Sequence, residues 1–363
     1  MLAKFPGSGE LLRYLGEDGA LAVQNAAAAD DAALLLGFYR AMSLTRTFDK
    51  KAVALQRVGK LGTFASSLGQ EAVGVGVASA MRAEDVLVPT YRDHAAQLLR
   101  GVTMVESLLY WGGDERGSNF AGPRSDFPNN VPIGTQVPHA VGAAYSFKLR
   151  RERRVAVCLI GDGGTSKGDF YEALNIAGVW RAPVVVVINN NQWAISMPRA
   201  AQSAAVRLAD KAIAAGIDSL QIDGNDVIAV HEAARAAIEA ARAGEGPTVI
   251  EALTYRLGDH TTADDASRYR APEELQEAWK REPVARLRAY LVARGWWSKE
   301  QEVALARECA AEVDAAVDAY LSVSPQPVEA MFDWLYAELP DALREQRETA
   351  LRYARPRGSA RDE

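Results

Sequence analysis

The sequence contains few cysteines. Only Cys158 and Cys309 occur among 363 residues, and Cys158 lies within an apolar run that is typical of a buried strand. Two cysteines cannot form a framework of several disulfides. We therefore expect Cys158 to be a small core side chain and the fold to depend on its hydrophobic core.

Long apolar runs and an excess of positive charge are also missing. The longest strongly apolar run, Pro183 to Ile188, is too short to span a bilayer, and the start, from Met1 to Pro6, lacks the apolar core of a secretory signal. The formal net charge is −6, and the sequence shows no concentrated basic face, which argues against a nucleic-acid partner. We expect a cytoplasmic protein that binds neither membranes nor nucleic acids.

The composition is that of a globular protein with a large core, because 48% of the residues are hydrophobic and 24% are charged. Beyond residue 30, expected strands alternate with expected helices. Continuous apolar runs such as Pro183 to Ile188 suit a parallel sheet that is covered on both faces. The expected strands lie at residues 86–89, 153–160, 183–188, 219–222 and 248–255. The main expected helices run from Asp30 or Asp31 toward Arg57, from Asp169 to Trp180, and from Asn225 or Asp226 toward Gly244.

This pattern predicts one α/β domain over residues 31–271, with a parallel sheet and helices on both faces. Residues 1–30 have little periodicity and are expected to form a loosely held arm. Residues 272–353 are expected to form a helical C-terminal appendage, with helices near 272–294, 298–322 and 326–336, followed by a frayed tail at 354–363.

Two polar clusters follow neighbouring expected strands. Gly161-Asp162-Gly163-Gly164 comes after one strand, and Asn189-Asn190-Asn191-Gln192-Trp193 after the next. Ligands of open parallel sheets bind beyond the carboxyl ends of the strands, so Asp162 and Asn191 are expected to face one point. Carboxylate and amide oxygens suit Mg²⁺, while glycine amides and the N-terminus of the next helix suit phosphate. Together these features predict a site for magnesium and a diphosphate.

Three other interpretations of the glycine cluster are weaker. A dinucleotide fingerprint requires glycine where Ser166 stands, and a P-loop requires a Gly-Lys-Ser/Thr order that Ser166-Lys167-Gly168 does not supply. A glycine-rich turn without a ligand would explain Gly161 to Gly163 alone. It does not explain the asparagine cluster after the following strand.

The region from Gly161 to Asn191 resembles the thiamin-diphosphate motif. Further matches occur in order along residues 35 to 340, at Leu68-Gly69-Gln70-Glu71-Ala72, Thr90-Tyr91-Arg92-Asp93-His94, Gly112 to Gly117, Ile133-Gly134-Thr135-Gln136 and His260 to Asp265. The chain is similar to the alpha subunit of the thiamin-diphosphate-dependent 2-oxo acid dehydrogenase component, of the bacterial pyruvate or the branched-chain type.

The resemblance implies a role for each matching residue. Asp162, Asn191 and the carbonyl of Trp193 would bind Mg²⁺. The diphosphate of thiamin diphosphate would be held by Tyr91, Arg92, Gly161, Gly163 and Gly164, and Ile133 would support the bent cofactor from below. Some relatives carry arginine at the position of Asn189, so the resemblance leaves a phosphate contact from this residue open.

Only four histidines occur, and one of them is expected to act in catalysis. His260 lies in a polar loop that looks mobile, and by resemblance it binds the cofactor, guides protons and assists acyl transfer to a lipoyl group. His231 is expected to be solvated on the polar face of a helix, and His139 to be structural. His94 is equally compatible with a structural and a functional role.

Thiamin chemistry also needs a glutamate against the aminopyrimidine, and the sequence contains only one α/β domain and no match to that residue. In two-subunit relatives the beta subunit supplies it. The resemblance therefore implies an α2β2 heterotetramer that oxidatively decarboxylates a small 2-oxo acid and transfers the acyl group to the lipoyl domain of a dihydrolipoyl acyltransferase. The motif from Gly112 to Gly117 favours pyruvate over a branched-chain substrate. An acetoin-cleaving relative and a non-catalytic scaffold are the alternatives.

Overall fold

The computed structural model describes residues 11–22 and 27–354. It consists of two compact units, of which the first ends at Asp318 and the second begins at Ala319. The first unit contains the sheet and is described first. Within the described residues, no helix is long and apolar enough to cross a membrane.

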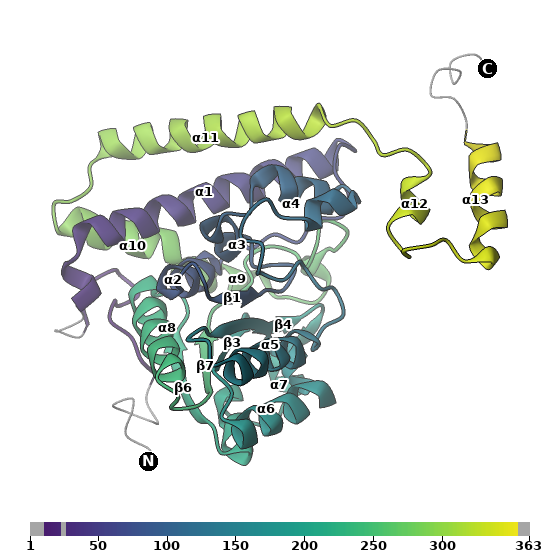
Figure 1. The fold of residues 1–363 in the computed structure, drawn as a ribbon. Helices are drawn as coiled ribbons and strands as arrows, with labels where there is room; N and C mark the ends of the chain where they lie inside the picture. The colour runs from purple at the N-terminus through teal and green to yellow at the C-terminus, as the bar shows by residue number, and fades with distance from the viewer. Residues whose placement is uncertain (1–10, 23–26, 355–363) are drawn as a thin grey trace. The chain divides into compact units, whose positions relative to one another are not determined.

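The centre of the first unit is a parallel sheet of five strands in the order β1-β2-β3-β7-β6 (Figure 1). The α/β prediction is thereby confirmed, and each expected strand is present with ends that differ by a few residues. The strands are β1 (Val86–Val88), β2 (Ala156–Gly161), β3 (Val184–Asn190), β6 (Asp218–Asp223) and β7 (Thr248–Leu253).

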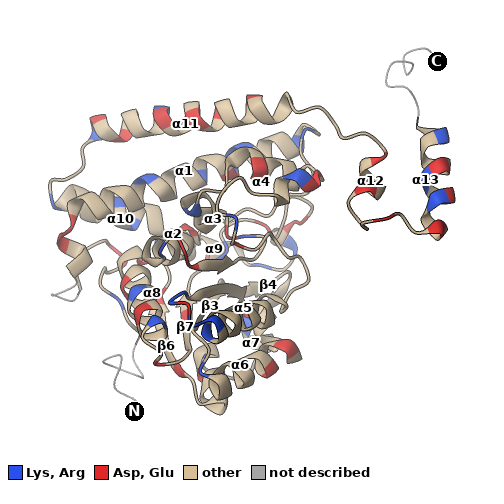
Figure 2. Cartoon of the chain, viewed as in Figure 1, with Lys and Arg blue, Asp and Glu red and all other residues tan. Residues whose placement is uncertain are grey.

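Both faces of this sheet are covered by helices. On β3, Val184, Val186 and Ile188 pack toward α5 (Gln136–Arg150) and α6 (Gly168–Trp180). The alternating residues Val185 and Val187 pack toward α2 (Glu71–Ala80) and α8 (Val227–Arg242). Figure 2 shows β3 without a charged residue. Burial on both faces explains the continuous apolar run, since each such side chain contributes about 1.5–3 kcal/mol when removed from water.

A long helix covers α2 on the side away from the sheet. This helix, α1 (Ala32–Arg57), begins at Asp31, whose Oδ1 accepts a hydrogen bond from the Leu34 amide at 3.0 Å. Its buried face, which includes Phe38 and Met42, packs in one apolar cluster with residues of α10 (Pro283–Ala293) and α11 (Lys299–Leu321). The helical segment up to Asp318 thus belongs to the same compact unit as the sheet.

The expectation of a loosely held N-terminal arm is wrong for residues 11–22. Leu15 is fully buried, and the amides of Tyr14 and Leu15 each donate to Asp226 Oδ2 at 2.7 Å. Asp226 also caps α8, so one carboxylate fastens the N-terminal segment to the start of that helix. Residues 1–10 and 23–26 of the expected arm lie outside the described residues.

The C-terminal helices differ from the expectation. The single helix expected at 272–294 is two helices, α9 (Pro272–Trp279) and α10, because Pro283 starts a new helix after its cap, Glu282. The helix expected at 326–336 is one short turn, α12 (Ala330–Asp333), and α13 (Asp341–Tyr353) was not expected. Both belong to the second unit. Residues 355–363 of the expected tail lie outside the described part of the chain.

The remaining elements are short and mostly connect the strands to their helices. They are η1 (Ala27–Asp30), α3 (His94–Arg100), α4 (Met104–Trp111), η2 (Glu115–Ser118), η3 (Asp162–Ser166), β4 (Trp193–Ala194), β5 (Met197–Pro198), α7 (Arg199–Gln202), η4 (Leu208–Ala215) and η5 (Ala266–Arg268).

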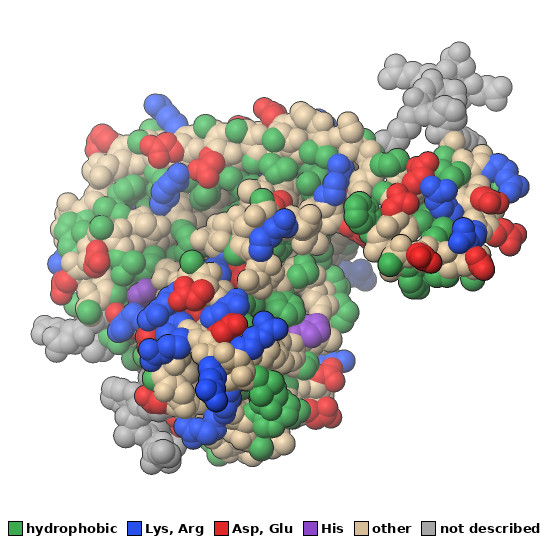
Figure 3. Space-filling view, in the orientation of Figure 1, with side chains coloured by type: hydrophobic (Ala, Val, Ile, Leu, Met, Phe, Trp, Pro, Cys, Tyr) green, Lys and Arg blue, Asp and Glu red, His purple; other side chains and the backbone are tan. Residues whose placement is uncertain are grey.

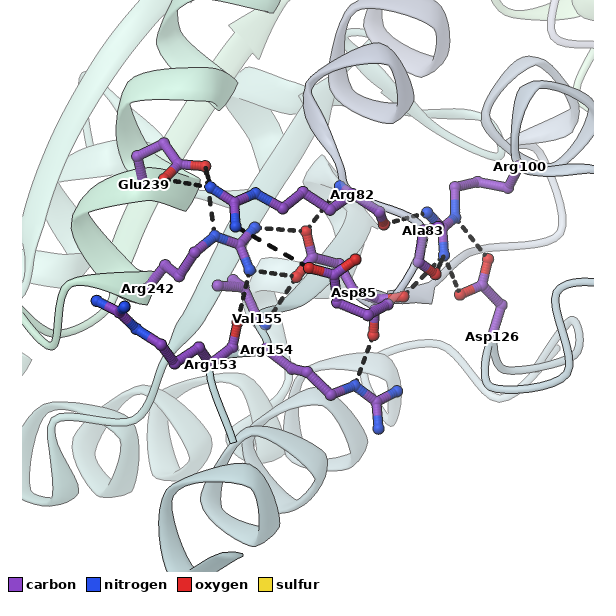
Figure 4. A network of polar contacts seen from close by, with 11 residues as sticks. Arg82, Ala83, Asp85, Arg100, Asp126, Arg153, Arg154, Val155, Glu239 and Arg242 are labelled. Carbon is purple, nitrogen blue, oxygen red and sulfur yellow. Dashed lines mark hydrogen bonds and ion pairs between the residues drawn. The ribbon is translucent and has the colours of Figure 1, made fainter. Parts of the chain in front are cut away.

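A buried ion pair fastens the amino ends of β1 and β2 to α8 (Figure 4). Asp85, which precedes β1, is fully buried. Its Oδ2 accepts from Arg242 Nη2 at 2.7 Å, and its Oδ1 accepts from Arg242 Nη1 at 2.9 Å and from the Val155 amide at 3.0 Å. The bidentate geometry satisfies both charges and compensates for their removal from water.

A group of basic side chains lies on the surface near this end of the sheet, and Figure 3 shows it on one face. At this end of the sheet, Lys148 and Arg150 in the last turn of α5, and Arg151 and Arg153 after it, are exposed. The expectation that the chain has no concentrated basic face therefore needs correction. The sequence analysis missed the group because acidic residues elsewhere make the net charge negative.

Candidate active site

The structure gathers the predicted site residues at the carboxyl end of the sheet. β2 ends at Gly161 and β3 at Asn190, and Gly161 lies beside Asn189 in the parallel register. A cavity of about 290 Å³ opens beyond these ends. All ten predicted residues line it: Tyr91, Arg92, Ile133, Gly161, Asp162, Gly163, Gly164, Asn191, Trp193 and His260.

Asp162 presents a buried carboxylate to this cavity. Burial raises its pKa from 3.8 to about 6, although backbone amides and the charge of Arg256 partly oppose the rise. Its Oδ2 accepts a long hydrogen bond, at 3.4 Å, from Gln202 Nε2, and no lysine or arginine of the described residues forms an ion pair with it. A buried carboxylate without a counter-charge is suited to a bound cation.

Asn191 and Trp193 complete the oxygen donors predicted for a metal. The Asn191 amide is oriented by Gln70, because Nδ2 donates to Gln70 Oε1 at 3.0 Å and Oδ1 accepts from the Trp193 amide at 3.2 Å. The Trp193 carbonyl accepts from Arg256 Nη1 at 3.2 Å. Each of these oxygens has a second lone pair, so the set of one carboxylate, one amide and one carbonyl fits Mg²⁺ together with phosphate and water.

Asn189 gives the clearest indication that the cavity binds a polar ligand. It lines the cavity and is only 4% exposed, yet neither its amide nitrogen nor its amide oxygen has a hydrogen-bond partner. A buried amide without partners costs about 1–3 kcal/mol, which a polar ligand in the cavity would recover. The sequence analysis did not predict this contact, because relatives differ at the position.

The glycines shape the wall of the cavity for close approach. A methyl group on Gly163 would lie 2.5 Å from Ala194 Cβ, and one on Gly164 would lie 2.6 Å from Ile160 Cγ1 and 3.2 Å from Ile133 Cγ2. A methyl group on Gly161 would meet nothing within 4 Å. Gly163 and Gly164 are therefore needed for packing, whereas Gly161 leaves space that a ligand can fill.

His260 faces the cavity in contact with Arg92. Arg92 Nη2 donates to the His260 carbonyl at 2.8 Å and lies 3.2 Å from His260 Nδ1. Burial, and then the charges of Arg92 and Arg256, lower the pKa of His260 to about 4, so the imidazole is neutral at neutral pH. Because Nδ1 accepts a hydrogen bond from a guanidinium, Nε2 carries the ring proton. Nε2–H can then donate a hydrogen bond to an oxygen or sulfur atom in the cavity. Tyr91 lies edge-on to the imidazole, with ring centres 6.3 Å apart.

The loop that carries His260 was expected to be mobile, but the structure shows it tied by several hydrogen bonds. The His260 amide donates to Asp264 Oδ2 at 2.8 Å, and the Thr262 amide donates to the Phe64 carbonyl at 2.9 Å. The side chain of Arg270 donates to the Gly258 carbonyl at 3.2 Å. These bonds give His260 a defined place relative to Arg92.

The sequence analysis missed Arg256 and gave Gln70 no role. Arg256 is almost fully buried, donates to the carbonyls of Trp193 and Ile195, and donates to the Tyr269 hydroxyl at 2.7 Å. It follows β7, so its position beyond a strand end was a usable signal. Gln70 lies within a quoted motif, but only the fold shows that it orients Asn191.

The other histidines lie outside the cavity. His94 is buried and stacked on Phe64, its Nε2 is 2.9 Å from the Ala65 carbonyl, and burial lowers its pKa to about 4, which resolves its open assignment toward a structural role. The expectation that His231 is solvated is wrong, since it is 7% exposed and its Nδ1 lies 2.9 Å from Ser79 Oγ. His139 is exposed at the start of α5.

Fold and site together define an α/β enzyme that holds a charged cofactor beyond the ends of its parallel strands. Residues 39–327 match the model of the dehydrogenase E1 component, and the chain belongs to this family.

Its relatives include the pyruvate dehydrogenase E1 component subunits alpha of Mycoplasma genitalium, 42% identical over 87% of this chain and 88% of the relative, and of Acholeplasma laidlawii, 43% identical over 88% and 93%. The 3-methyl-2-oxobutanoate dehydrogenase subunit alpha of Mycobacterium tuberculosis is 43% identical over 85% of this chain and 84% of the relative.

These matches confirm the resemblance seen in the sequence. They also confirm the predicted class of enzyme, a 2-oxo acid dehydrogenase component, whose family implies thiamin diphosphate as cofactor.

Proposed function

We propose that this chain is the cofactor-holding alpha subunit of an enzyme that oxidatively decarboxylates pyruvate and transfers the acetyl group to lipoamide. A branched-chain 2-oxo acid is the alternative substrate. The observation that carries the proposal is that all ten predicted residues line one cavity, which is also lined by the unpartnered amide of Asn189.

The residues around the cavity fit thiamin diphosphate and magnesium. Asp162 Oδ2, Asn191 Oδ1 and the Trp193 carbonyl would hold Mg²⁺. The diphosphate would lie against Arg92, Tyr91 and the glycines, with Asn189 as a further donor, and Ile133 would support the cofactor from below. When bound, the cofactor supplies the electron sink for decarboxylation. The chain itself supplies charge and shape.

His260 would assist acyl transfer as a hydrogen-bond donor. Its Nε2–H points away from Arg92, because Nδ1 accepts the hydrogen bond. When the lipoyl disulfide opens, one sulfur takes the acyl group and the other leaves as a thiolate, which the His260 Nε2–H would stabilise by donating a hydrogen bond until solvent protonates it. The low pKa keeps the imidazole neutral, so Nε2–H acts as a hydrogen-bond donor and not as a charged acid.

The chain needs a partner to complete the site. Of the described residues that line the cavity, only Asp162 carries a carboxylate, and its place is with the metal. Glu71 does not line the cavity, since it is fully buried and pairs with Arg46 at 2.8 Å. A beta subunit in an α2β2 heterotetramer would supply the glutamate against the aminopyrimidine, and a dihydrolipoyl acyltransferase would bring the lipoyl domain.

The test is a reconstitution with the product of the neighbouring beta-type gene. Decarboxylation of pyruvate and of 3-methyl-2-oxobutanoate is measured with thiamin diphosphate and Mg²⁺, for this chain alone and for the mixture. Activity in the mixture only is expected, and the preferred acid identifies the substrate. Activity of the chain alone would contradict the split site. If the two subunits associate but decarboxylate neither acid, the result would favour acetoin as substrate, which is tested in the same assay, or a non-catalytic scaffold role.

A further inference from the structure

We propose that Asp49, on α1, is a positioning residue that sets the place of His260 in the cavity. The inference rests on the proposed role of His260. It concerns the extended segment Phe64–Leu68, called here the platform segment, which lies between α1 and α2. Asp49 fastens this segment from one side, and the His260 loop lies on it from the other.

The platform segment holds the His260 loop at both ends. Before His260, the Leu257 amide donates to the Leu68 carbonyl at 3.1 Å. After His260, the Thr262 amide donates to the Phe64 carbonyl at 2.9 Å, and Thr262 Oγ1 accepts from the Phe64 amide at 3.0 Å. The loop therefore follows any shift of the platform segment.

The middle of the platform segment also sets Arg92. Arg92 Nη1 donates to the Ser66 carbonyl at 2.6 Å, while its Nη2 donates to the His260 carbonyl at 2.8 Å. Two nitrogens of one rigid guanidinium thus connect Ser66 with His260. A displaced Ser66 carbonyl would move the Arg92 guanidinium. The hydrogen bond from Arg92 to His260 Nδ1 would then weaken, and this bond is what keeps the ring proton on Nε2.

Asp49 anchors the platform at this point. Its Oδ2 accepts from the Ser67 amide at 2.6 Å, from Ser67 Oγ at 2.9 Å and from Ser66 Oγ at 2.9 Å. The side chain is only 2% exposed, and its Oδ1 has no hydrogen-bond partner. Burial raises its pKa to about 6, so the carboxylate is held at a cost in stability. No lysine or arginine of the described residues forms an ion pair with it. The structural contribution of Asp49 is therefore its three hydrogen bonds to Ser66 and Ser67.

The first measurement is hydrogen exchange at the amides of Leu257 and Thr262 in the reconstituted enzyme. Asp49→Ala removes all three anchoring bonds and is expected to accelerate exchange at both amides. The matched control is Thr45→Val, one turn earlier on α1, where a buried hydroxyl donates only to the Ala41 carbonyl of its own helix, at 2.9 Å. This variant should exchange as the wild type does. Equal exchange in all three proteins would overturn the proposal.

The second measurement separates acyl transfer from decarboxylation. Reduction of hexacyanoferrate(III) reports decarboxylation without a lipoyl group, whereas acylation of a lipoyl domain needs both steps. Because a displacement of about 1 Å can cost about 100-fold in rate, Asp49→Ala should lower lipoyl acylation by about 10-fold to 100-fold. Hexacyanoferrate reduction should fall much less. Asp49→Asn, which keeps one acceptor oxygen, should recover part of the loss.

A double-variant cycle tests whether Asp49 acts through His260. In a His260→Ala background, Asp49→Ala should lower lipoyl acylation no further. Additive losses would show an independent structural role and overturn the proposal. If Asp49→Ala does not assemble with the beta subunit, Ser67→Ala, which removes one of the three bonds, serves in the same assays. Failure of the wild-type mixture to use any 2-oxo acid would instead refute the proposed function, and the exchange result would still decide whether Asp49 holds the loop.

Discussion

Replacing Asp162 with asparagine should make the cofactor-free chain more stable while it abolishes cofactor binding. The carboxylate is buried, and its pKa rises from 3.8 to about 6 because burial disfavours the charged form. Since a tenfold change in proton affinity is worth about 1.4 kcal/mol, holding the ionised form in the fold costs roughly 3 kcal/mol. Asparagine has nearly the same shape and carries no such charge.

The sign of this effect depends on pH in a defined way. Between the unfolded pKa and the folded pKa, the native state binds more protons than the unfolded state, so the free energy of unfolding decreases as the pH rises. The gain from Asp162→Asn should therefore be absent near pH 4, grow through pH 5 and 6, and reach its full value of roughly 3 kcal/mol above pH 7.

The assay is urea unfolding of the full chain without thiamin diphosphate or Mg²⁺, at several pH values and one protein concentration. Asp169→Asn is the matched control, because its carboxylate is partly exposed, at 46%, on the neighbouring helix. Calorimetric titration with the cofactor and Mg²⁺ follows at pH 8. A variant that is no more stable than the wild type at pH 8, or equally more stable at pH 4, would refute the reasoning. Normal cofactor affinity would remove Asp162 from the metal site.

Three further predictions concern other residues. Asp85→Ala removes the bidentate partner of buried Arg242, which among the described residues keeps only the more exposed Glu239 as a counter-charge, at 3.3 Å, and should lower the free energy of unfolding by about 3–5 kcal/mol, measured by urea titration. His260→Ala should preserve the fold, seen by circular dichroism, and lower lipoyl acylation by about 100-fold; unchanged turnover would exclude it from the reaction. Gly163→Ala places a methyl group 2.5 Å from a neighbouring one and should lower both the free energy of unfolding, by about 1–3 kcal/mol, and the cofactor affinity. Gly161→Ala, which meets open space, should lower affinity only.

Much of the fold could be predicted because the strands are buried on both faces. A continuous apolar run such as that of β3 leaves few alternatives to a parallel sheet between helices. The same topology predicted the site, since Asp162 and Asn191 each follow a strand end and such ends meet at one edge. Arg256 also follows a strand end, that of β7. A single arginine at such a position does not by itself indicate a ligand.

The missed features depend on contacts that lie far apart in the sequence. Asp226 holds the N-terminal segment through backbone amides. Every residue type except proline has such an amide, so the sequence of the segment does not indicate the contact. His231 is on the polar side of α8 by periodicity, but Ser79 from α2 and Phe38 from α1 cover it. The break between the two helices before Pro283 could have been predicted, since proline favours the first turn of a helix. It was missed because the apolar residues on either side continue at helical spacing.

The order of the strands has a consequence for how the chain is made. β7 is the last strand to leave the ribosome, yet it lies between β3 and β6. Until it emerges, β3 has an open apolar edge, and β6 can pair with no other strand of the sheet, since its only other β-bridge among the described residues is the one with Leu12. The nascent chain is therefore expected to need chaperone protection over this interval. The cofactor pocket, whose last wall contains His260, can form only after almost three quarters of the chain has been synthesised. A shorter version that ends before Thr248 would not be a smaller enzyme but an unfinished sheet.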